Sequence, residues 1–212
     1  MQKTDSIQSG GRKPSRITRG VAFYDEFLAA DAQRDVVAAL RDVARAAPMF
    51  SPDTPYGKPM SVRLTAAGQF GWYSDRTGYR YVPQHPNGFA WPDIPETILD
   101  VWRAVAPDAP QPECCLVNYY REGAKMGLHQ DRDEADFRWP VVSISLGDDA
   151  LFRIGNVTKG GSTVSEWLRS GDVCVMGGDA RLVYHGIDRI KFGTSPLLTQ
   201  GGRINLTLRV VT

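Results

Sequence analysis

Apolar and polar residues alternate along the C-terminal end of the chain. Residues 203–210 read Arg-Ile-Asn-Leu-Thr-Leu-Arg-Val, with an apolar residue at every second position. A period of two predicts a β-strand with two different faces. The apolar face would join a core, whereas the polar face could either meet solvent or line a site. That polar face carries Arg203, Asn205, Thr207 and Arg209.

Two earlier segments, residues 31–47 and 96–106, have the spacing of amphipathic helices. Their apolar residues recur three and four positions apart, which places them on one helical stripe. From Glu113 onward, short β-like runs are separated by Gly or Asp turns. This order predicts a mostly β fold, an antiparallel double sheet of jelly-roll type with two outer helices.

A β-hairpin is predicted between these helices, over residues 71–81. Two aromatic runs flank the turn sequence Asp75-Arg76-Thr77-Gly78, a pattern typical of a tight hairpin. Alternation places Tyr79 and Tyr81 on one face. These aromatic side chains could pack only against each other, as cross-strand aromatic pairs often do, or they could face a ligand.

Composition favours one compact domain. The chain has 212 residues, of which 42% are hydrophobic, and that is enough for one sizeable core. Residues 1–20 are rich in Ser, Gly, Lys and Arg without an apolar run, so we expect a flexible basic tail and no secretory signal. No apolar stretch is long enough to span a membrane.

Charge and cysteine content indicate which binding surface and which redox environment to expect. The formal net charge is +1, which gives no support for a broad basic surface. The three cysteines, Cys114, Cys115 and Cys174, are odd in number and lack a metal-binding CxxC spacing, so we expect free thiols in a reducing, cytoplasmic location.

The chain carries candidate metal ligands at His129, Asp131 and His185. On an extended segment, residues two apart point to the same side, so His129 and Asp131 can converge on one ion. His185 follows the apolar run Leu182-Val183-Tyr184, which would bring it to a core; a buried structural histidine is the alternative. Two imidazoles and one carboxylate form the facial triad that holds non-haem Fe(II) and leaves open positions.

The two arginines of the C-terminal strand suggest an acid beside that metal. Arg203 and Arg209 lie about 20 Å apart at ~3.3 Å per residue, so they cannot grip one small group side by side. They could close on a short dicarboxylate from opposite ends, because the guanidinium fork suits bidentate pairing with a carboxylate.

With these features the chain resembles the Fe(II)/2-oxoglutarate dioxygenases, and specifically the AlkB nucleic-acid dealkylases. The resemblance runs from about residue 20 to the end and follows one order of motifs. These are Asn118-x-Tyr120, Gly123-Ala124-Lys125, Leu128-His129-Gln130-Asp131-x-Asp133-Glu134, Val142-Ser143-x-Ser145-Leu146-Gly147, Gly171-Asp172-Val173, Gly177-Gly178, Tyr184-His185-Gly186-Ile187 and Asn205-Leu206-Thr207-x-Arg209. It implies a single dioxygenase domain over residues 21–212, with a nucleotide-recognition lid at about 50–90 and a jelly-roll core at about 113–212.

The resemblance also implies the cofactors. The triad would hold Fe(II), with 2-oxoglutarate and O2 as cosubstrates. The distal carboxylate of 2-oxoglutarate would pair with Arg203 and Tyr120, and Arg209 and Asn118 would sit towards its chelating end, with Ser143 and Asn205 nearby. Oxidation of an N-methyl group would release formaldehyde, succinate and CO2.

The implied substrate is alkylated DNA, single- or double-stranded, and possibly RNA, bearing N1-methyladenine or N3-methylcytosine. Trp72 would stack on the flipped base, and the strand with Tyr79, Arg80 and Tyr81 would contact it. Both methylated bases are cationic, so the carboxylates of Asp133 and Glu134 could recognise them. Lys159 stands where the family pattern has an arginine that touches substrate. We expect the protein to be a monomer. The alternative function is that of a 2-oxoglutarate-dependent hydroxylase of a small molecule or a protein side chain.

Overall fold

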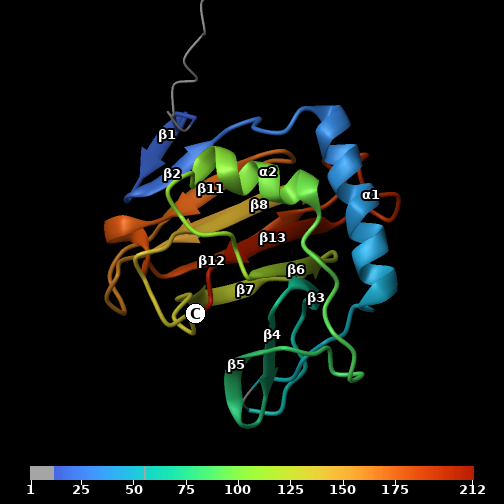
Figure 1. Cartoon of the computed structure of the whole chain (residues 1–212). Coiled ribbons are helices and arrows are strands. Elements are labelled where there is room, and N and C mark those ends of the chain that lie inside the picture. The colour runs from blue at the N-terminus through green and yellow to red at the C-terminus, as the bar shows by residue number, and fades with distance from the viewer. Residues whose placement is uncertain (1–11, 55) are drawn as a thin grey trace, which may run out of the picture.

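The computed structural model describes residues 12–54 and 56–212 and consists of two packed sheets, a hairpin and two helices (Figure 1). The larger sheet has seven strands in the order β1-β2-β11-β8-β13-β6-β3, and the smaller has four in the order β10-β9-β12-β7. The large-sheet strands are β1 (Arg16–Thr18), β2 (Val21–Tyr24), β3 (Arg63–Gly68), β6 (Cys114–Tyr120), β8 (Val141–Gly147), β11 (Val173–Met176) and β13 (Arg203–Arg209). The small-sheet strands are β7 (Met126–His129), β9 (Asp149–Ile154), β10 (Val164–Leu168) and β12 (His185–Lys191).

From β6 onward, successive strands lie in opposite sheets, except β9 and β10, which pair with each other in the small sheet; this arrangement is typical of a jelly roll. Strands β6, β8, β11 and β13 lie in the large sheet, and β7, β9, β10 and β12 lie in the small one. One part of the core lies between the sheets, where Phe23, Phe152, Leu168 and Met176 are buried. The predicted double sheet is therefore confirmed, and the space between its layers is available for a site.

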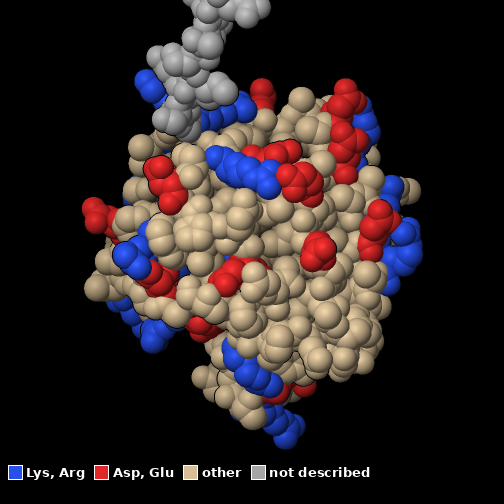
Figure 2. Space-filling model, viewed as in Figure 1, with Lys and Arg blue, Asp and Glu red and all other residues tan. Residues whose placement is uncertain are grey.

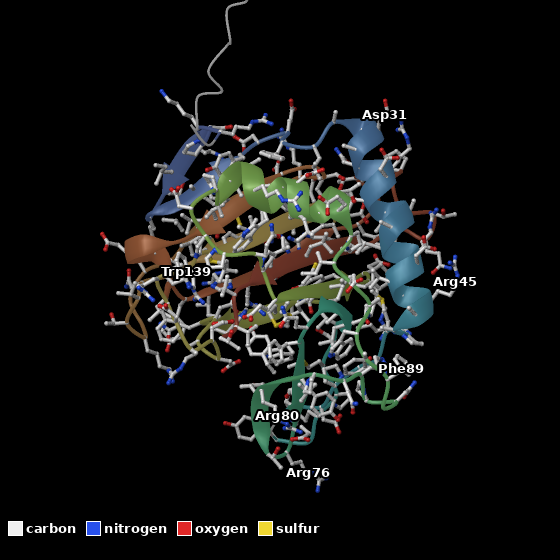
Figure 3. All side chains as sticks on the ribbon, viewed as in Figure 1. Asp31, Arg45, Arg76, Arg80, Phe89 and Trp139 are labelled. Atoms are coloured by element: carbon white, nitrogen blue, oxygen red, sulfur yellow. The ribbon has the colours of Figure 1, made fainter. Side chains whose placement is uncertain are left out.

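Both predicted helices form within one residue of the expected bounds, as α1 (Ala30–Ala46) and α2 (Glu96–Val105). They cover the outer face of the large sheet (Figure 1), where Leu40, Ile98 and Trp102 pack with the sheet residues Ile144 and Leu206. Their polar residues face outward, and Asp31 and Arg45 mark the exposed side of α1 in Figure 3. Within the described part of the chain, neither helix is long and apolar enough to cross a membrane.

The predicted hairpin is present as β4 (Gly71–Asp75) and β5 (Gly78–Val82), which pair antiparallel around a two-residue turn. It projects from the double sheet at the end nearest β6 and β7 (Figure 1). Within the predicted lid range of about 50–90, residues 63–68 form β3, which pairs with β6 at the edge of the large sheet. Residues 64–67 are all buried. Leu64 and Ala66 pack with Phe50 and Trp91, and Ala67 joins the main core, which explains why this segment joins the sheet.

The predicted flexible tail of residues 1–20 includes a short strand. Residues 16–18 form strand β1, which pairs with β2 at the other edge of the large sheet. Arg16 holds it there, since its guanidinium lies over the Phe23 ring and pairs with Asp25 and Glu166. The remainder of the tail prediction, for residues 1–11, lies outside the described residues. Cys114, Cys115 and Cys174 are buried free thiols on strands, as predicted.

Surface charge on the face shown in Figure 2 is mixed. Lysine and arginine side chains are interspersed with aspartate and glutamate, and wide uncharged areas separate them. This agrees with the nearly balanced formal charge of +1. Recognition of a polyanion would therefore depend on local contacts around a site.

Candidate active site

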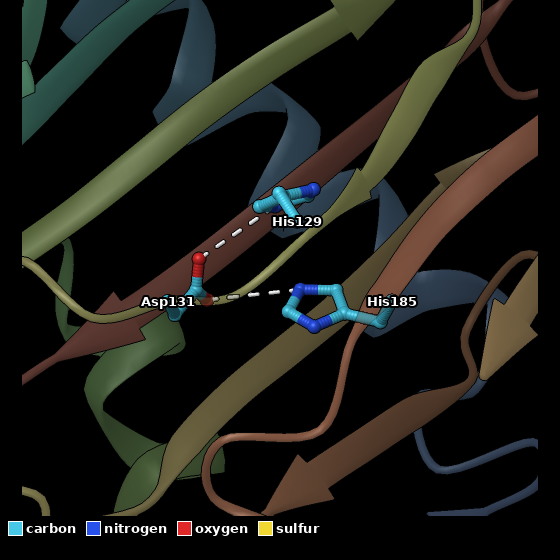
Figure 4. A group of neighbouring side chains, drawn as sticks. All are labelled: His129, Asp131 and His185. Carbon is cyan, nitrogen blue, oxygen red and sulfur yellow. Dashed lines mark ion pairs between the residues drawn. The ribbon is translucent and has the colours of Figure 1, made fainter. Parts of the chain in front are cut away.

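The three predicted metal ligands converge at one end of the double sheet (Figure 4). His129 ends β7 and His185 begins β12, and these two residues are direct partners in the antiparallel register. Asp131 follows β7 by two residues. The ligand atoms of the three side chains lie within 4.8 Å of one another. The Asp131 carboxylate is 3.7 Å from His129 Nε2 and 3.8 Å from His185 Nε2.

Both imidazoles are oriented with Nε2 towards the carboxylate. His129 Nδ1 lies 2.9 Å from the Gly127 carbonyl, and His185 Nδ1 lies 3.0 Å from the Val183 carbonyl. A carbonyl can only accept, so each Nδ1 carries the proton and each Nε2 keeps its lone pair for a metal. The alternative that His185 is only a structural buried histidine is therefore not supported.

Close packing beside His185 fixes the two ligand strands. A Cβ at Gly186 would lie 2.6 Å from the Met126 carbonyl oxygen and 2.7 Å from that of Gly127. Only glycine lets β12 approach β7 this closely. The third histidine, His85, is separate: its Nε2 lies 2.9 Å from the Pro48 carbonyl, and its ring stacks on Phe89.

Electrostatics favour the protonation states that bind a metal. Burial would raise the pKa of Asp131, but the charge of Arg209, aided by His185 and His129, lowers it below the usual range. Burial, together with neighbouring His129, lowers the pKa of His185 to about 4. At neutral pH the cluster therefore offers one carboxylate and an uncharged imidazole, the forms that metal coordination requires.

A cavity of about 810 Å³ opens onto this cluster. The polar face of β13 forms one wall, so Arg203, Asn205, Thr207 and Arg209 are not a solvated surface. Strands β6 and β8 add more of the predicted residues. These are Asn118, Tyr120 and Ser143.

Arg203 identifies the end of the cavity that suits a carboxylate. Its side chain is fully buried, and Nη2 donates to Ser145 Oγ at 2.9 Å. Among the described residues, Nε and Nη1 have no hydrogen-bond partner, although buried donors are normally paired. Burial lowers the pKa of Arg203, and the Tyr120 ring packs 5.3 Å from the guanidinium. The unpaired donors of this buried guanidinium are therefore available to an anionic group such as a carboxylate.

Arg209 lies at the metal end of the same strand. Its Nη2 is 2.9 Å from Asp131 Oδ2, so it pairs with the metal-ligand carboxylate. The two arginines thus occupy the two ends of the β13 wall, as the alternation predicted. The donor set and the unpaired Arg203 donors fit Fe(II) at the triad and a dicarboxylate such as 2-oxoglutarate between the arginines.

Three predicted substrate residues lie at the mouth of the cavity, two from the hairpin and one from the loop after β7. Trp72, Tyr79 and Asp133 all line it. The Trp72 indole stacks on the Tyr79 ring, with centroids 5.3 Å apart, and its Nε1 donates to Asp133 Oδ2 at 3.0 Å. An aromatic plane and a carboxylate therefore lie together on the wall of the cavity that the three metal ligands also line.

The structure does not bring Arg80, Tyr81, Glu134 or Lys159 to the cavity wall. Arg80 lies on the opposite face of the hairpin from Tyr79, because neighbouring strand residues alternate. Figure 3 shows Arg80 on the hairpin with Arg76 at its tip. Arg80 pairs with Asp75 at 2.7 Å and lies over the Tyr73 ring, so a substrate contact by Arg80 is not supported.

Lys159 is exposed on the loop between β9 and β10. Arg19 anchors this loop by donating to Asn156 Oδ1 at 2.7 Å and to the Ser162 carbonyl at 2.8 Å. The family pattern that suggested Lys159 as a substrate residue does not include this local geometry. Glu134 and Tyr81 are turned away from the cavity into a buried network.

Sequence reasoning missed one buried residue in this network, Arg181, and several that line the cavity. The lining residues include Lys58, Met60, Met126 and Leu128. Arg181 stands in a Gly-rich turn, and its partners are about fifty positions away along the chain. No local pattern could therefore have identified it.

Comparisons with known proteins agree with this geometry. The family model described as the 2OG-Fe(II) oxygenase superfamily matches residues 20–209. The chain is 54% identical over 198 residues to the alpha-ketoglutarate-dependent dioxygenase AlkB homolog of Caulobacter vibrioides, covering 93% of this chain and 90% of that protein. It is 41% identical over 188 residues to the alpha-ketoglutarate-dependent dioxygenase AlkB of Escherichia coli, covering 86% of each.

A solved structure gives the same result for the fold. The structure of OsALKBH1 superposes with a TM-score of 0.76 at 31% sequence identity, covering 92% of this chain and 99% of that chain. The chain therefore belongs to the 2OG-Fe(II) oxygenase superfamily and, within it, to the AlkB family.

Proposed function

We propose that this protein is a DNA oxidative demethylase that repairs N-alkylated bases, N1-methyladenine and N3-methylcytosine among them. The observation that carries the proposal is the position of Trp72 and Asp133 at the mouth of a cavity that ends at the His129–Asp131–His185 cluster. An aromatic face and a carboxylate are the groups that bind a flat cation.

Each part of the site has a task in this reaction. His129, Asp131 and His185 would hold Fe(II), and Arg203 would bind the distal carboxylate of 2-oxoglutarate, with Tyr120 packed against it. When bound, Fe(II), 2-oxoglutarate and O2 would supply the oxidising power that hydroxylates the N-methyl carbon while 2-oxoglutarate becomes succinate and CO2. The hydroxymethyl group then leaves the base nitrogen as formaldehyde.

The protein's own residues select and orient the base. A methyl group on the Watson–Crick edge is inaccessible in a duplex, so the base must be unpaired or extruded. Trp72 would stack on the extruded base, and Asp133 would exchange its bond to the indole N–H for a contact with the cationic ring. Desolvation in the cavity strengthens both interactions. Action on RNA and function as a cytoplasmic monomer remain predictions.

Replacing Trp72 with alanine tests whether the substrate is a nucleic-acid base. Loss of stacking is worth about 1–3 kcal/mol per base, so kcat/KM for a methylated oligonucleotide should fall by about tenfold to a hundredfold. The measurement is oligonucleotide-dependent succinate formation, with Mn²⁺ titration to check that metal binding is unchanged. Trp167→Ala is the matched control, because Trp167 is an exposed tryptophan on β10 outside the cavity. Equal activity of wild type and Trp72→Ala would show that Trp72 does not stack on the base, whereas no oligonucleotide-dependent activity in wild type would favour a hydroxylase of another substrate.

Replacing Asp133 with asparagine tests recognition of charge. The variant keeps an oxygen that can accept from Trp72 Nε1 but loses the negative charge. We expect kcat/KM for N1-methyladenine, a cation, to fall about tenfold, or about 1.4 kcal/mol, with a smaller change for the neutral base N3-methylthymine. Asp136→Asn is the control, because Asp136 pairs with Arg138 outside the cavity. A parallel fall for both lesions would exclude Asp133 as the charge-selective group.

A further inference from the structure

Glu134 is buried, yet it does not face the cavity. Its side chain is 1% exposed, and its ion-pair partners Arg181 and Arg209 are buried as well. Arg181 Nη2 is 2.9 Å from Oε2, and Arg209 Nε is 3.3 Å from Oε1. The Tyr81 hydroxyl also donates to Oε1. With both carboxylate oxygens paired to these three side chains, Glu134 has a structural environment unlike that of its neighbour Asp133.

Arg209 joins this carboxylate to the metal cluster. The same guanidinium that contacts Glu134 places Nη2 2.9 Å and Nε 3.3 Å from Asp131 Oδ2. Its Nη1 donates to the Tyr81 hydroxyl at 3.2 Å. A single buried side chain therefore contacts a metal ligand, an interior carboxylate and a residue of the lid hairpin.

Arg181 belongs to the same network and lies on the segment that carries the metal ligand His185. It lies four residues before His185 and is 3% exposed. Its Nη1 donates to the backbone carbonyl of Asp131 at 2.6 Å, and its Nε donates to the Trp139 carbonyl at 2.8 Å. Arg181 thus links the turn that precedes His185 to the backbone of the loop that contains Asp131.

The charges of this cluster balance. Asp131 and Glu134 are two carboxylates, and Arg181 and Arg209 are two guanidinium groups, all of them buried. Buried ions that are paired on every side hold one geometry, because moving any one of them leaves another unpaired. Tyr81 is the only uncharged member, and it is the member that belongs to the hairpin.

We propose that Tyr81, Glu134, Arg181 and Arg209 are positioning residues that couple the lid hairpin to the metal ligand Asp131. When Tyr81 is docked, its hydroxyl holds Glu134 and Arg209, and Arg209 holds the Asp131 carboxylate in place for the metal. Coupling between two sites is reciprocal, so a bound metal also holds the hairpin closed. The proposal rests on the metal site of the proposed function and assigns Glu134 to the lid connection rather than to substrate contact.

Tyr81→Phe tests this coupling, because it removes one hydroxyl and keeps the ring. Isothermal titration with Mn²⁺ should give an affinity about fivefold to tenfold weaker than that of wild type, the lower part of the usual range for coupled sites. The matched control is Tyr73→Phe, the same change in the same hairpin on the face that carries Arg80. Its Mn²⁺ affinity should equal that of wild type.

Hydrogen exchange of residues 71–82 supplies the reciprocal measurement. In wild type, Mn²⁺ should slow exchange in the hairpin by the same factor by which Tyr81→Phe weakens Mn²⁺ binding. In Tyr81→Phe, exchange should be faster and no longer respond to Mn²⁺; a purely structural role would make it faster with and without metal alike. Unchanged Mn²⁺ affinity in Tyr81→Phe, or a hairpin that still responds fully to metal, would overturn the coupling. Failure of wild type to bind Mn²⁺ would instead contradict the proposed function.

Discussion

Replacing His129 with alanine is expected to abolish turnover, with a loss of about a thousandfold or more, because two of the three metal ligands then remain. The fold should survive, since the His129 side chain is 41% exposed and ends a strand. The variant therefore distinguishes loss of metal-dependent activity from loss of the folded structure. Fe(II)-dependent succinate formation measures the first, and thermal unfolding without metal measures the second.

Metal-dependent stability provides a second measurement on the same variant. A ligand at one hundred times its Kd stabilises a folded protein by about 2.7 kcal/mol, so Mn²⁺ should raise the melting temperature of wild type. We expect this increase to be lost in His129→Ala. His85→Gln should retain it, because His85 contacts Pro48 and Phe89 and not the cluster. An undiminished increase in His129→Ala would mean that the metal binds elsewhere.

Replacing Arg203 with methionine is expected to remove 2-oxoglutarate binding while leaving the ligand-free protein at least as stable. Removing one partner of a buried ion pair costs about 3 kcal/mol, which is roughly two orders of magnitude in affinity. In the ligand-free protein, however, Arg203 is a buried cation whose Nε and Nη1 are unpaired. Methionine fills similar space without that desolvation cost.

Two measurements separate these effects. Titration of 2-oxoglutarate in the presence of Mn²⁺ should show the loss of affinity, and denaturant unfolding without ligand should show equal or greater stability. Arg203→Lys should be intermediate, since lysine keeps the charge but loses the fork. The control is Arg189→Met, an exposed arginine on β12. Normal 2-oxoglutarate affinity in Arg203→Met would place the acid elsewhere.

The parts of the site that depend on local periodicity could be predicted from the sequence. The strand of residues 203–209 and its polar face follow from a period of two, and the two helices follow from a period near 3.6. The pairing of His129 with Asp131 follows from their spacing. These features depend on backbone geometry over a few residues, which is why the structure reproduces them closely.

The structure differs from the sequence-based prediction where tertiary contacts decide the position of a side chain. Alternation continued beyond β7 would place Asp133 on the side of Asp131, which is correct, but it says nothing about Glu134, whose partners come from β5, β13 and the turn before β12. Arg80 was assigned to substrate with its neighbours, although its own strand turns it the other way. Strands β1 and β3 were missed because each is stabilised by the sheet it joins more than by its own sequence.

The most direct test of oxidative demethylation is the mass of a single-stranded oligonucleotide that carries one N1-methyladenine. It is incubated in air with Fe(II), 2-oxoglutarate and either wild type or His129→Ala. We expect the oligonucleotide to lose the mass of one CH₂ group with wild type alone, with formaldehyde formed in equal amount. An unchanged oligonucleotide with wild type that has bound Fe(II) and 2-oxoglutarate would contradict the assignment.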